Sequence, residues 1–233
     1  MIPPGRHLNW QCNEADAVGF VLAGGQSTRM GRDKALVEFG GRPLLLHAIA
    51  ALRAAGLPVF IAGARTPLDA YAPVVPDSRQ NAGPPGGICT ALESIRHTLP
   101  PNMAQYAVFL SVDQPLMPPS LLVYLLYHAR MTGSAVTLPS VNGFAQTFPV
   151  VLTVDSLAVL ETELSSGRTG SYAAFQAAAA ARGEAVSVLR VEVLVQSGKI
   201  AHPAALPAAH WFLNINAPPD LSRASSIAAG RVS

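Results

Sequence analysis

One stretch, residues 18–38, limits what this chain can fold into and do more than any other: VGFVLAGGQSTRMGRDKALVE. A short apolar run leads into the glycine pair Gly24-Gly25, and a polar segment with cations at Arg29 and Lys34 follows. A buried strand that ends in a glycine turn exposes backbone N–H groups, which bind phosphate when cations lie nearby. This order predicts an anion-binding loop; the alternative is an ordinary glycine turn with surface cations.

Two common phosphate-binding motifs do not match this stretch. A Walker-type loop needs a lysine directly after its second glycine and then Ser or Thr, whereas Lys34 lies well beyond Gly25 and precedes Ala35. A dinucleotide fingerprint needs G-x-G-x-x-G at the start of a helix, and Gly24, Gly25 and Gly31 do not have that spacing. The loop therefore belongs to another class of nucleotide or phosphate site.

Composition excludes several other classes of protein. Half of the 233 residues are hydrophobic and 13% are charged, so we expect a substantial core rather than disorder. A formal charge of +2 with scattered basic residues argues against nucleic acid as a partner. Cys12 and Cys89 show no metal-binding or disulfide spacing, and the six histidines show no zinc motif. With no signal region or long apolar segment, we expect a cytoplasmic protein that does not enter a membrane.

The first part of the chain alternates between strand and helix patterns. Beyond a flexible extension at 1–16, the chain is predicted to be one domain over 17–230. After the first strand, the patterns predict a helix at 44–56, strands at 58–63, 74–77 and 106–112, a glycine loop at 81–87, and helices at 88–95 and 118–130. This rhythm predicts an α/β fold whose mostly parallel sheet is flanked by helices. Ligands bind beyond the carboxyl ends of such strands, so Gly24, Asp77, the 83–87 glycines and Asp113 should line one crevice.

The second part of the chain is less regular. The patterns predict strands at 135–138 and 147–152 joined by a turn at Asn142-Gly143, helices at 155–166 and 171–182, strands at 186–195 and 211–216, and a helix from Pro218. No repeat or linker divides the chain.

Five polar residues are candidates for the chemistry. Asp113, at the mouth of a buried strand, suits Mg²⁺, which binds one or two carboxylates together with substrate phosphates; the alternative is a helix cap. Lys34 and Arg29 would neutralise the charge that develops during phosphoryl transfer, although Lys34 could instead be a solvated cation at a helix start. Asn214 and Asn216 alternate along the chain, so both face one side, where they could bind a metal or phosphate or only satisfy a turn.

Asp77 is a weaker candidate. It follows Pro76 at the end of a very short predicted strand. Its carboxylate could accept hydrogen bonds from a nucleotide base or position the 81–87 loop, and it could equally be a turn residue.

Four segments in order resemble one family. Leu22-Ala23-Gly24-Gly25, Arg29-Met30-Gly31 and Asp33-Lys34 resemble the signature L-A-G-G-x(3)-R-M-G-x-D-K of the nucleotidyltransferases that mature the molybdenum cofactor. Further matches are Gly83-Pro84-Pro85-Gly86-Gly87-Ile88 with the second glycine loop, Asp113-Gln114-Pro115 with a metal-binding D-x-P, and Asn214-Ile215-Asn216 with the closing N-x-N motif.

This resemblance implies a three-layer Rossmann-like fold and transfer of GMP from GTP to the phosphate of molybdenum-molybdopterin, with release of pyrophosphate. It implies Mg²⁺ as cofactor, held by Asp113 with Asn216, and an acceptor contacted by Asn214 and Asn216. The nucleotide-binding residues it implies are Leu22, Ala23, Gly24, Gly25, Lys34, Asp77, Gly83, Gly86 and Asp113; Arg29, Lys34 and Asp113 would be catalytic. A molybdenum-insertion protein or target-enzyme chaperone is a further implied partner.

The chain departs from the family pattern at two places. Ala62 or Gly63 replaces an asparagine that helps to read the base, and Thr147-Phe148-Pro149 replaces a His-Pro-Thr-like stretch near the acceptor. Gly25 agrees with the guanylyl type. A cytidylyltransferase, a sugar-1-phosphate nucleotidyltransferase, and a non-catalytic nucleotide- or cofactor-binding protein remain alternatives.

Overall fold

A computed structural model describes residues 16–24, 33–63, 68–77, 82–99, 104–168 and 170–230. The strands of its main sheet are β1 (Ala17–Leu22), β4 (Val59–Ala62), β5 (Val74–Val75), β6 (Tyr106–Ser111), β7 (Val136–Val141), β8 (Phe144–Ala145), β9 (Val150–Thr153) and β10 (Ser187–Arg190). Their order is β10-β7-β9-β6-β1-β4-β5, with β8 paired to β7. A separate small hairpin consists of β2 (Glu38–Phe39) and β3 (Arg42–Pro43).

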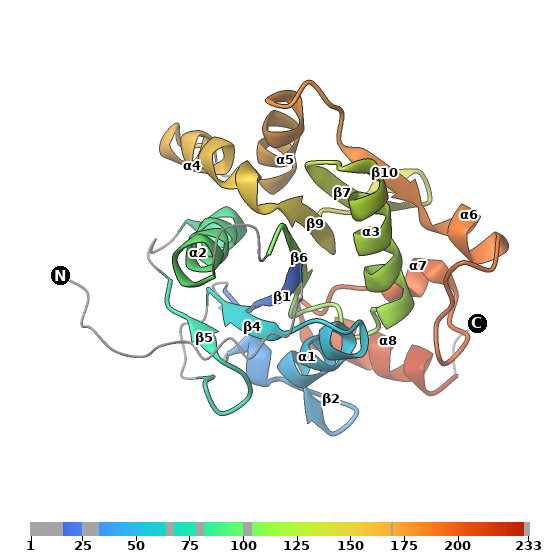
Figure 1. Cartoon of the computed structure of the whole chain (residues 1–233). Coiled ribbons are helices and arrows are strands. Elements are labelled where there is room, and N and C mark those ends of the chain that lie inside the picture. The colour runs from blue at the N-terminus through green and yellow to red at the C-terminus, as the bar shows by residue number, and fades with distance from the viewer. Residues whose placement is uncertain are drawn as a thin grey trace.

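Helices cover both faces of the main sheet (Figure 1). They are α1 (Leu44–Ala54), α2 (Gly83–Thr98), α3 (Pro119–Thr132), α4 (Leu157–Ser165), α5 (Ser171–Ala180), α6 (Val191–Gln196), α7 (Ala208–Trp211) and α8 (Pro218–Ala228), with 3₁₀ turns η1 (Lys34–Leu36) and η2 (Val154–Ser156). Side chains alternate along β1, so Phe20 packs in the core under α2, α4 and α5, whereas Val21 packs in the core under α1, α3 and α8. The predicted three-layer α/β fold is confirmed.

The strand directions bring several chain segments to one edge of the sheet. β1 runs parallel to both β4 and β6, and Leu22 at its end lies opposite Ala62 and Ser111, the last residues of those strands. β9 is antiparallel to its neighbours β6 and β7, so its first residue, Val150, lies toward the end of β6. The mostly parallel sheet thus gathers the carboxyl ends of β1, β4 and β6 and the start of β9 along one edge, which we call the carboxyl edge.

Most predicted elements are confirmed, but one predicted strand is too long and another is wrong. The segment 186–195 forms a strand only to Arg190, and α6 follows, since burying Val191 and Leu194 at helical spacing outweighs the β-propensity of its valines. The segment 211–216 is not a strand; Trp211 ends α7, where its indole N–H donates to the carbonyl of Leu206 (2.8 Å). In both segments tertiary packing decided against the local pattern.

The predicted glycine loop at 81–87 is also wrong in part, because α2 already begins at Gly83. Pro84 and Pro85 fit the first turn of a helix, where their missing N–H groups would have no partner within the helix. The Asn142-Gly143 turn exists, with both residues at positive φ, but it joins β7 to β8 before the chain reaches β9.

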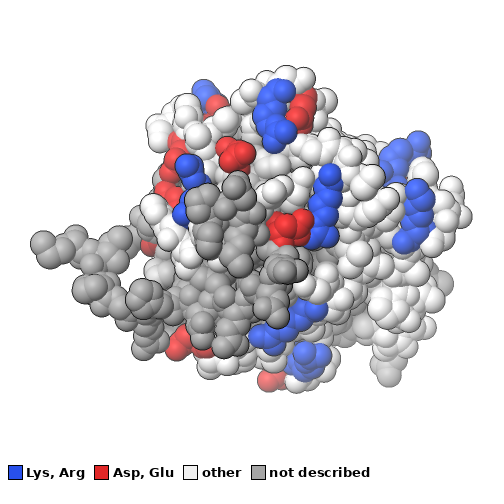
Figure 2. All heavy atoms as spheres, viewed as in Figure 1, with Lys and Arg blue, Asp and Glu red and all other residues white. Residues whose placement is uncertain are grey.

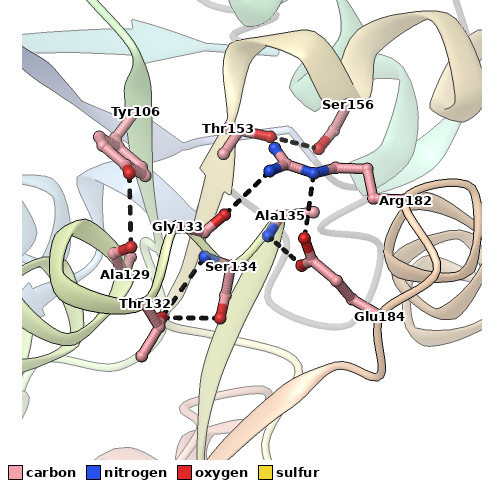
Figure 3. A network of polar contacts seen from close by, with 10 residues as sticks. All are labelled: Tyr106, Ala129, Thr132, Gly133, Ser134, Ala135, Thr153, Ser156, Arg182 and Glu184. Atoms are coloured by element: carbon pink, nitrogen blue, oxygen red, sulfur yellow. Dashed lines mark hydrogen bonds and ion pairs between the residues drawn. The ribbon is translucent and has the colours of Figure 1, made fainter.

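The opposite edge of the sheet carries a polar network that the fold itself satisfies (Figure 3). The Tyr106 hydroxyl donates to the carbonyl of Ala129 (3.3 Å), and Arg182 donates to the carbonyl of Gly133 (3.1 Å) and pairs with Glu184 (3.2 Å). A cavity of about 620 Å³ lies beside Tyr106 and Arg182. Since these groups already bond one another, they serve to hold the ends of α3 and α5 in place.

Charged side chains are dispersed in small groups over the face shown in Figure 2, and several Lys or Arg residues lie next to Asp or Glu. Among the described residues, no helix combines the length and the apolar character that crossing a membrane requires.

Candidate functional site at the carboxyl edge

Glycines allow three segments to meet where β1 and β4 end. The backbone N–H of Ala23 donates to the carbonyl of Ala62 (3.0 Å). A Cβ on Gly24 would lie only 2.7 Å from the carbonyl oxygen of Gly63, and Gly63 itself has φ +72°. Gly87 of α2 packs against the same residue: a Cβ on Gly87 would lie 3.7 Å from the Cα of Gly63. Residues 24 and 63 therefore must be glycine, and the backbone is exposed at Gly24, as predicted.

Lys34 begins η1 and points to the end of β6. The side chain of Asp33 caps this turn by accepting from the N–H of Ala35 (2.9 Å), which fixes the backbone from which Lys34 projects. The Lys34 ammonium donates to Oδ2 of Asp113 (2.9 Å) and to Oδ1 of Asn216 (2.5 Å). Three predicted site residues, far apart in the sequence, thus meet at one point.

Asp113 lies just past β6, and only one of its two carboxylate oxygens is hydrogen-bonded within the described part of the protein. Its side chain is 17% exposed, and Oδ2 bonds Lys34. Oδ1 is buried and has no hydrogen-bond partner in the part of the chain that the structure describes. A buried, unpartnered carboxylate oxygen is costly unless a ligand completes it. The helix-cap alternative for Asp113 is not observed, because Pro118 precedes α3 and that helix has no side-chain cap.

The C-terminal segment reaches Asp113 through its backbone. The N–H of Ile215 donates to the carbonyl of Asp113 (2.9 Å), and Ile215 is buried between the exposed Asn214 and Asn216. The carboxylate of Asp220, in the first turn of α8, accepts from the N–H groups of Asn216 (2.9 Å) and Ala217 (2.8 Å). Asn216 is therefore held from both sides, whereas no hydrogen bond among the described residues joins Asn214 to Lys34 or Asp113.

The remaining predicted residues lie around the same edge. Asp77 is exposed just past β5 and accepts a long hydrogen bond from the Thr90 hydroxyl on α2 (3.5 Å). Gly83 is exposed at the start of α2, whereas Gly86 is buried and its N–H faces the carbonyl of Ala82 (3.4 Å). Gly25 and Arg29 lie outside the described residues. The binding and catalytic roles of all these residues stay predictions.

Sequence reasoning missed the contributions of Gly63 and Gly87. Gly63 was noted only as a replacement for an asparagine, and Gly87 only as part of a loop. The available signal was the position of Gly63 directly after a buried strand, where a neighbouring strand end also carries glycine.

The oxygen atoms at this point fit a hard divalent cation. Asp113 Oδ2 and Asn216 Oδ1 already converge on one positive charge, the Lys34 ammonium, and Asp113 Oδ1 has no partner among the described residues. Mg²⁺ takes one or two carboxylates and fills its shell with waters and substrate phosphates. Within the described ranges no three His, Cys, Asp or Glu side chains gather in one place.

Comparisons with known proteins agree with this arrangement. Residues 19–191 match the family model of the MobA-like NTP transferase domain. A molybdenum cofactor guanylyltransferase of Rhizobium leguminosarum is 31% identical over 215 residues, covering 90% of this chain and 92% of that protein. The guanylyltransferase of Xanthomonas euvesicatoria is 41% identical over 109 residues, which cover 46% of this chain and only 52% of the relative.

A solved structure shares the fold. Molybdopterin-guanine dinucleotide biosynthesis protein A from Archaeoglobus fulgidus superposes with a TM-score of 0.69 at 21% identity, covering 91% of this chain and 98% of that one.

Proposed function

This chain belongs to the MobA-like NTP transferase family and is a nucleotidyltransferase, and from that premise we propose that it transfers GMP from GTP to the phosphate of molybdenum-molybdopterin. In this reaction an oxygen of the acceptor phosphate attacks the α-phosphorus of GTP. The bond between the α-phosphorus and the oxygen that bridges to the β-phosphorus breaks, and pyrophosphate leaves. The product is the guanine dinucleotide form of the cofactor.

The convergence of Lys34, Asp113 and Asn216 is the observation that carries this proposal. A cation held 2.9 Å from a carboxylate and 2.5 Å from an amide oxygen, at the same edge of the sheet as the exposed Gly24, suits a triphosphate and its metal. A protein that only bound a nucleotide would not need a half-satisfied carboxylate next to the phosphates.

Asp113 and Asn216 would hold Mg²⁺, which when bound supplies charge neutralisation at the triphosphate. The chain's own groups do the rest. Lys34 stabilises negative charge that builds on the phosphate oxygens, and the N–H groups near Gly24 and Gly83 bind the phosphates. Arg29 is proposed to share the role of Lys34. Asp77 is proposed to bind the nucleoside, and Asn214 to contact the acceptor.

Product analysis tests this proposal. We expect the purified protein, given Mg²⁺, molybdopterin carrying molybdenum and each of the four NTPs in turn, to form a dinucleotide only with GTP. Transfer from CTP alone would replace the guanylyl assignment by the cytidylyl one, which the loss of a side chain at Gly63 would then help to explain. Transfer to a sugar 1-phosphate, with none to molybdopterin, would show that the proposed acceptor is wrong.

Asp113→Asn tests the mechanism. We expect pyrophosphate release to fall roughly 10²–10³-fold, the scale of losing one electrostatic element of a transfer site, and binding of Mn²⁺, as a probe for Mg²⁺, to weaken in calorimetry. Asp155→Asn is the control, because Asp155 is exposed at the opposite edge beside the cavity described above. Unchanged pyrophosphate release in Asp113→Asn would exclude the proposed role of this carboxylate.

A further inference from the structure

Gln114, the residue after Asp113, has one half of its amide satisfied and the other half not. The side chain is buried, with 5% of its surface exposed. Its Nε2 donates to the carbonyl of Phe148 (3.3 Å), while its Oε1 is buried without a partner among the described residues. Because a carbonyl can only accept, the nitrogen must face Phe148, and the orientation of the amide is fixed.

Buried polar atoms without a partner are few in this protein. In the part of the chain that the structure describes there are four on side chains, and two of them belong to the adjacent residues Asp113 and Gln114. An unsatisfied buried oxygen destabilises the fold, so its presence calls for an explanation. An apolar side chain of the same shape would avoid this cost but could not bond Phe148.

The link to Phe148 continues the sheet where its own pairing stops. The ladder between β6 and β9 ends at the pair Phe109 and Val150. Beyond that pair the amide of Gln114 spans the gap and holds the carbonyl of Phe148, whose ring packs edge-on against Phe175 of α5 (6.5 Å). Segment 147–149, before β9, is thus joined to the loop that carries Asp113.

This link spans the two halves of the carboxyl edge. Gly24 and Asp77, two of the residues predicted to bind nucleotide, follow β1 and β5 on one side of β6, and Asp113 follows β6 itself. Segment 147–149 precedes β9 on the other side of β6. We propose that Gln114 is a positioning residue for the acceptor: its bond to Phe148 sets where the acceptor-side segment stands relative to Asp113. The inference rests on the proposed function, which supplies molybdopterin as the second substrate and assigns segment 147–149 to the side where it binds.

Gln114→Met tests the proposal, because methionine keeps the length and volume of the side chain but cannot donate to Phe148. Calorimetry with the full chain would measure GTP and molybdopterin separately, and steady-state kinetics would give KM for each. We expect the Kd and KM for molybdopterin to rise by up to about tenfold, because the lost hydrogen bond lies within the protein and reaches the acceptor only through the position of segment 147–149. Those for GTP, and the affinity for Mn²⁺, should stay within twofold of wild type.

Gln114→Glu serves as the second variant, because its carboxylate keeps the shape but opposes the carbonyl of Phe148. It should weaken molybdopterin binding at least as much as Gln114→Met. Equal losses for GTP and molybdopterin, or no loss for either, would overturn the positioning role. The proposed function fails separately, in the wild-type protein: if that protein binds GTP but neither binds molybdopterin nor transfers GMP to it, molybdopterin is not the acceptor.

Discussion

The two halves of the carboxyl edge are built in different ways. On the proposed nucleotide side, backbone packs on backbone: Ala23 bonds Ala62, and Gly24 lies against Gly63. On the proposed acceptor side, side chains make the connections: Gln114 bonds Phe148, and Asn216 bonds Lys34, a residue 182 positions away in sequence. Close backbone packing tolerates almost no change of residue, whereas a side-chain hydrogen bond can be altered by a single substitution that leaves the others in place.

The largest expected effect comes from Lys34, where the two halves meet. Lys34→Met should lower pyrophosphate release roughly 10²–10³-fold, because the ammonium faces the site where charge develops. Mn²⁺ binding in calorimetry should survive, since Asp113 and Asn216 remain. The other lysine of the chain, Lys199, is exposed and donates to the Tyr124 hydroxyl on α3, so Lys199→Met is the matched control and should keep full activity. A Lys34→Met enzyme within threefold of wild type would remove Lys34 from the mechanism.

The backbone-built half predicts a loss of stability as well as of binding. In Gly24→Ala the new Cβ would meet the Gly63 carbonyl oxygen at 2.7 Å, and backbone must move to relieve it. Urea unfolding should show about 1–3 kcal/mol of destabilisation, the usual cost of overpacking, and GTP affinity should fall. Gly170→Ala is the control, because Gly170 has φ −78° and its Cβ would touch only the Ala173 Cβ at 4.0 Å. Equal stabilities for the two variants would show that the close approach carries no cost.

The same contrast explains how much could be predicted from the sequence. The strand ends with Gly24, Asp77 and Asp113 could be located because apolar runs and turn residues are local signals, and parallel strands bring their ends together. The crevice predicted from the strand ends includes Asp113 but neither Lys34 nor Asn216, which only the family resemblance assigns to the same site. No local pattern states that Ile215 bonds the backbone of Asp113, since that contact depends on how α7 and α8 pack.

The errors have the same origin. The alternating Asn214-Ile215-Asn216 resembled a strand, and the burial does alternate there, but the segment pairs with the loop after β6 instead of joining the sheet. The valines of α6 favour a strand by propensity, which the burial of Val191 and Leu194 outweighs. The glycines of α2 favour a loop, whereas Pro84 and Pro85 fit the first turn of a helix. Gln114 was visible only as the middle of a motif, because its partner Phe148 is distant in sequence.

Replacing Asp220 should disturb the position of Asn216, with a smaller effect than the changes above. Its carboxylate accepts from the N–H groups of Asn216 and Ala217, and so sets the position of Asn216 and the start of α8 together. Asp220→Ala should cost about 1 kcal/mol in urea unfolding, as the loss of a helix cap does, and should lower kcat/KM by less than Lys34→Met. Ser222→Ala, in the same helix and exposed, is the control. If Asp220→Ala lost stability but kept full activity, the hydrogen bonds from Asp220 would not be needed to position Asn216 for catalysis.

The smallest expected effect is a pH dependence confined to the C-terminal part. Burial lowers the pKa of His202 below its ordinary value, against a smaller opposing effect of a backbone hydrogen bond at Leu116. Its Nδ1 accepts from the N–H of Ala204 (3.0 Å), and its ring lies 6.1 Å from that of Trp211, in the segment that leads to Asn214.

The sign of the effect follows from that direction. As pH falls below about 6.5, the ordinary pKa of histidine, the unfolded chain takes up the proton first. Stability is therefore lost between this value and the lower pKa of the folded state, and no further loss from His202 follows at still lower pH. In a Trp10→Phe background, Trp211 fluorescence during urea unfolding should show this slope, and His202→Gln should reduce it relative to wild type, whereas the exposed His97→Gln should not. Because side-chain hydrogen bonds hold the proposed acceptor half together, we expect the segment around Trp211 to lose stability at a higher pH than the glycine-packed half does. A slope unchanged in His202→Gln would assign the acid sensitivity to other groups and remove this difference between the halves.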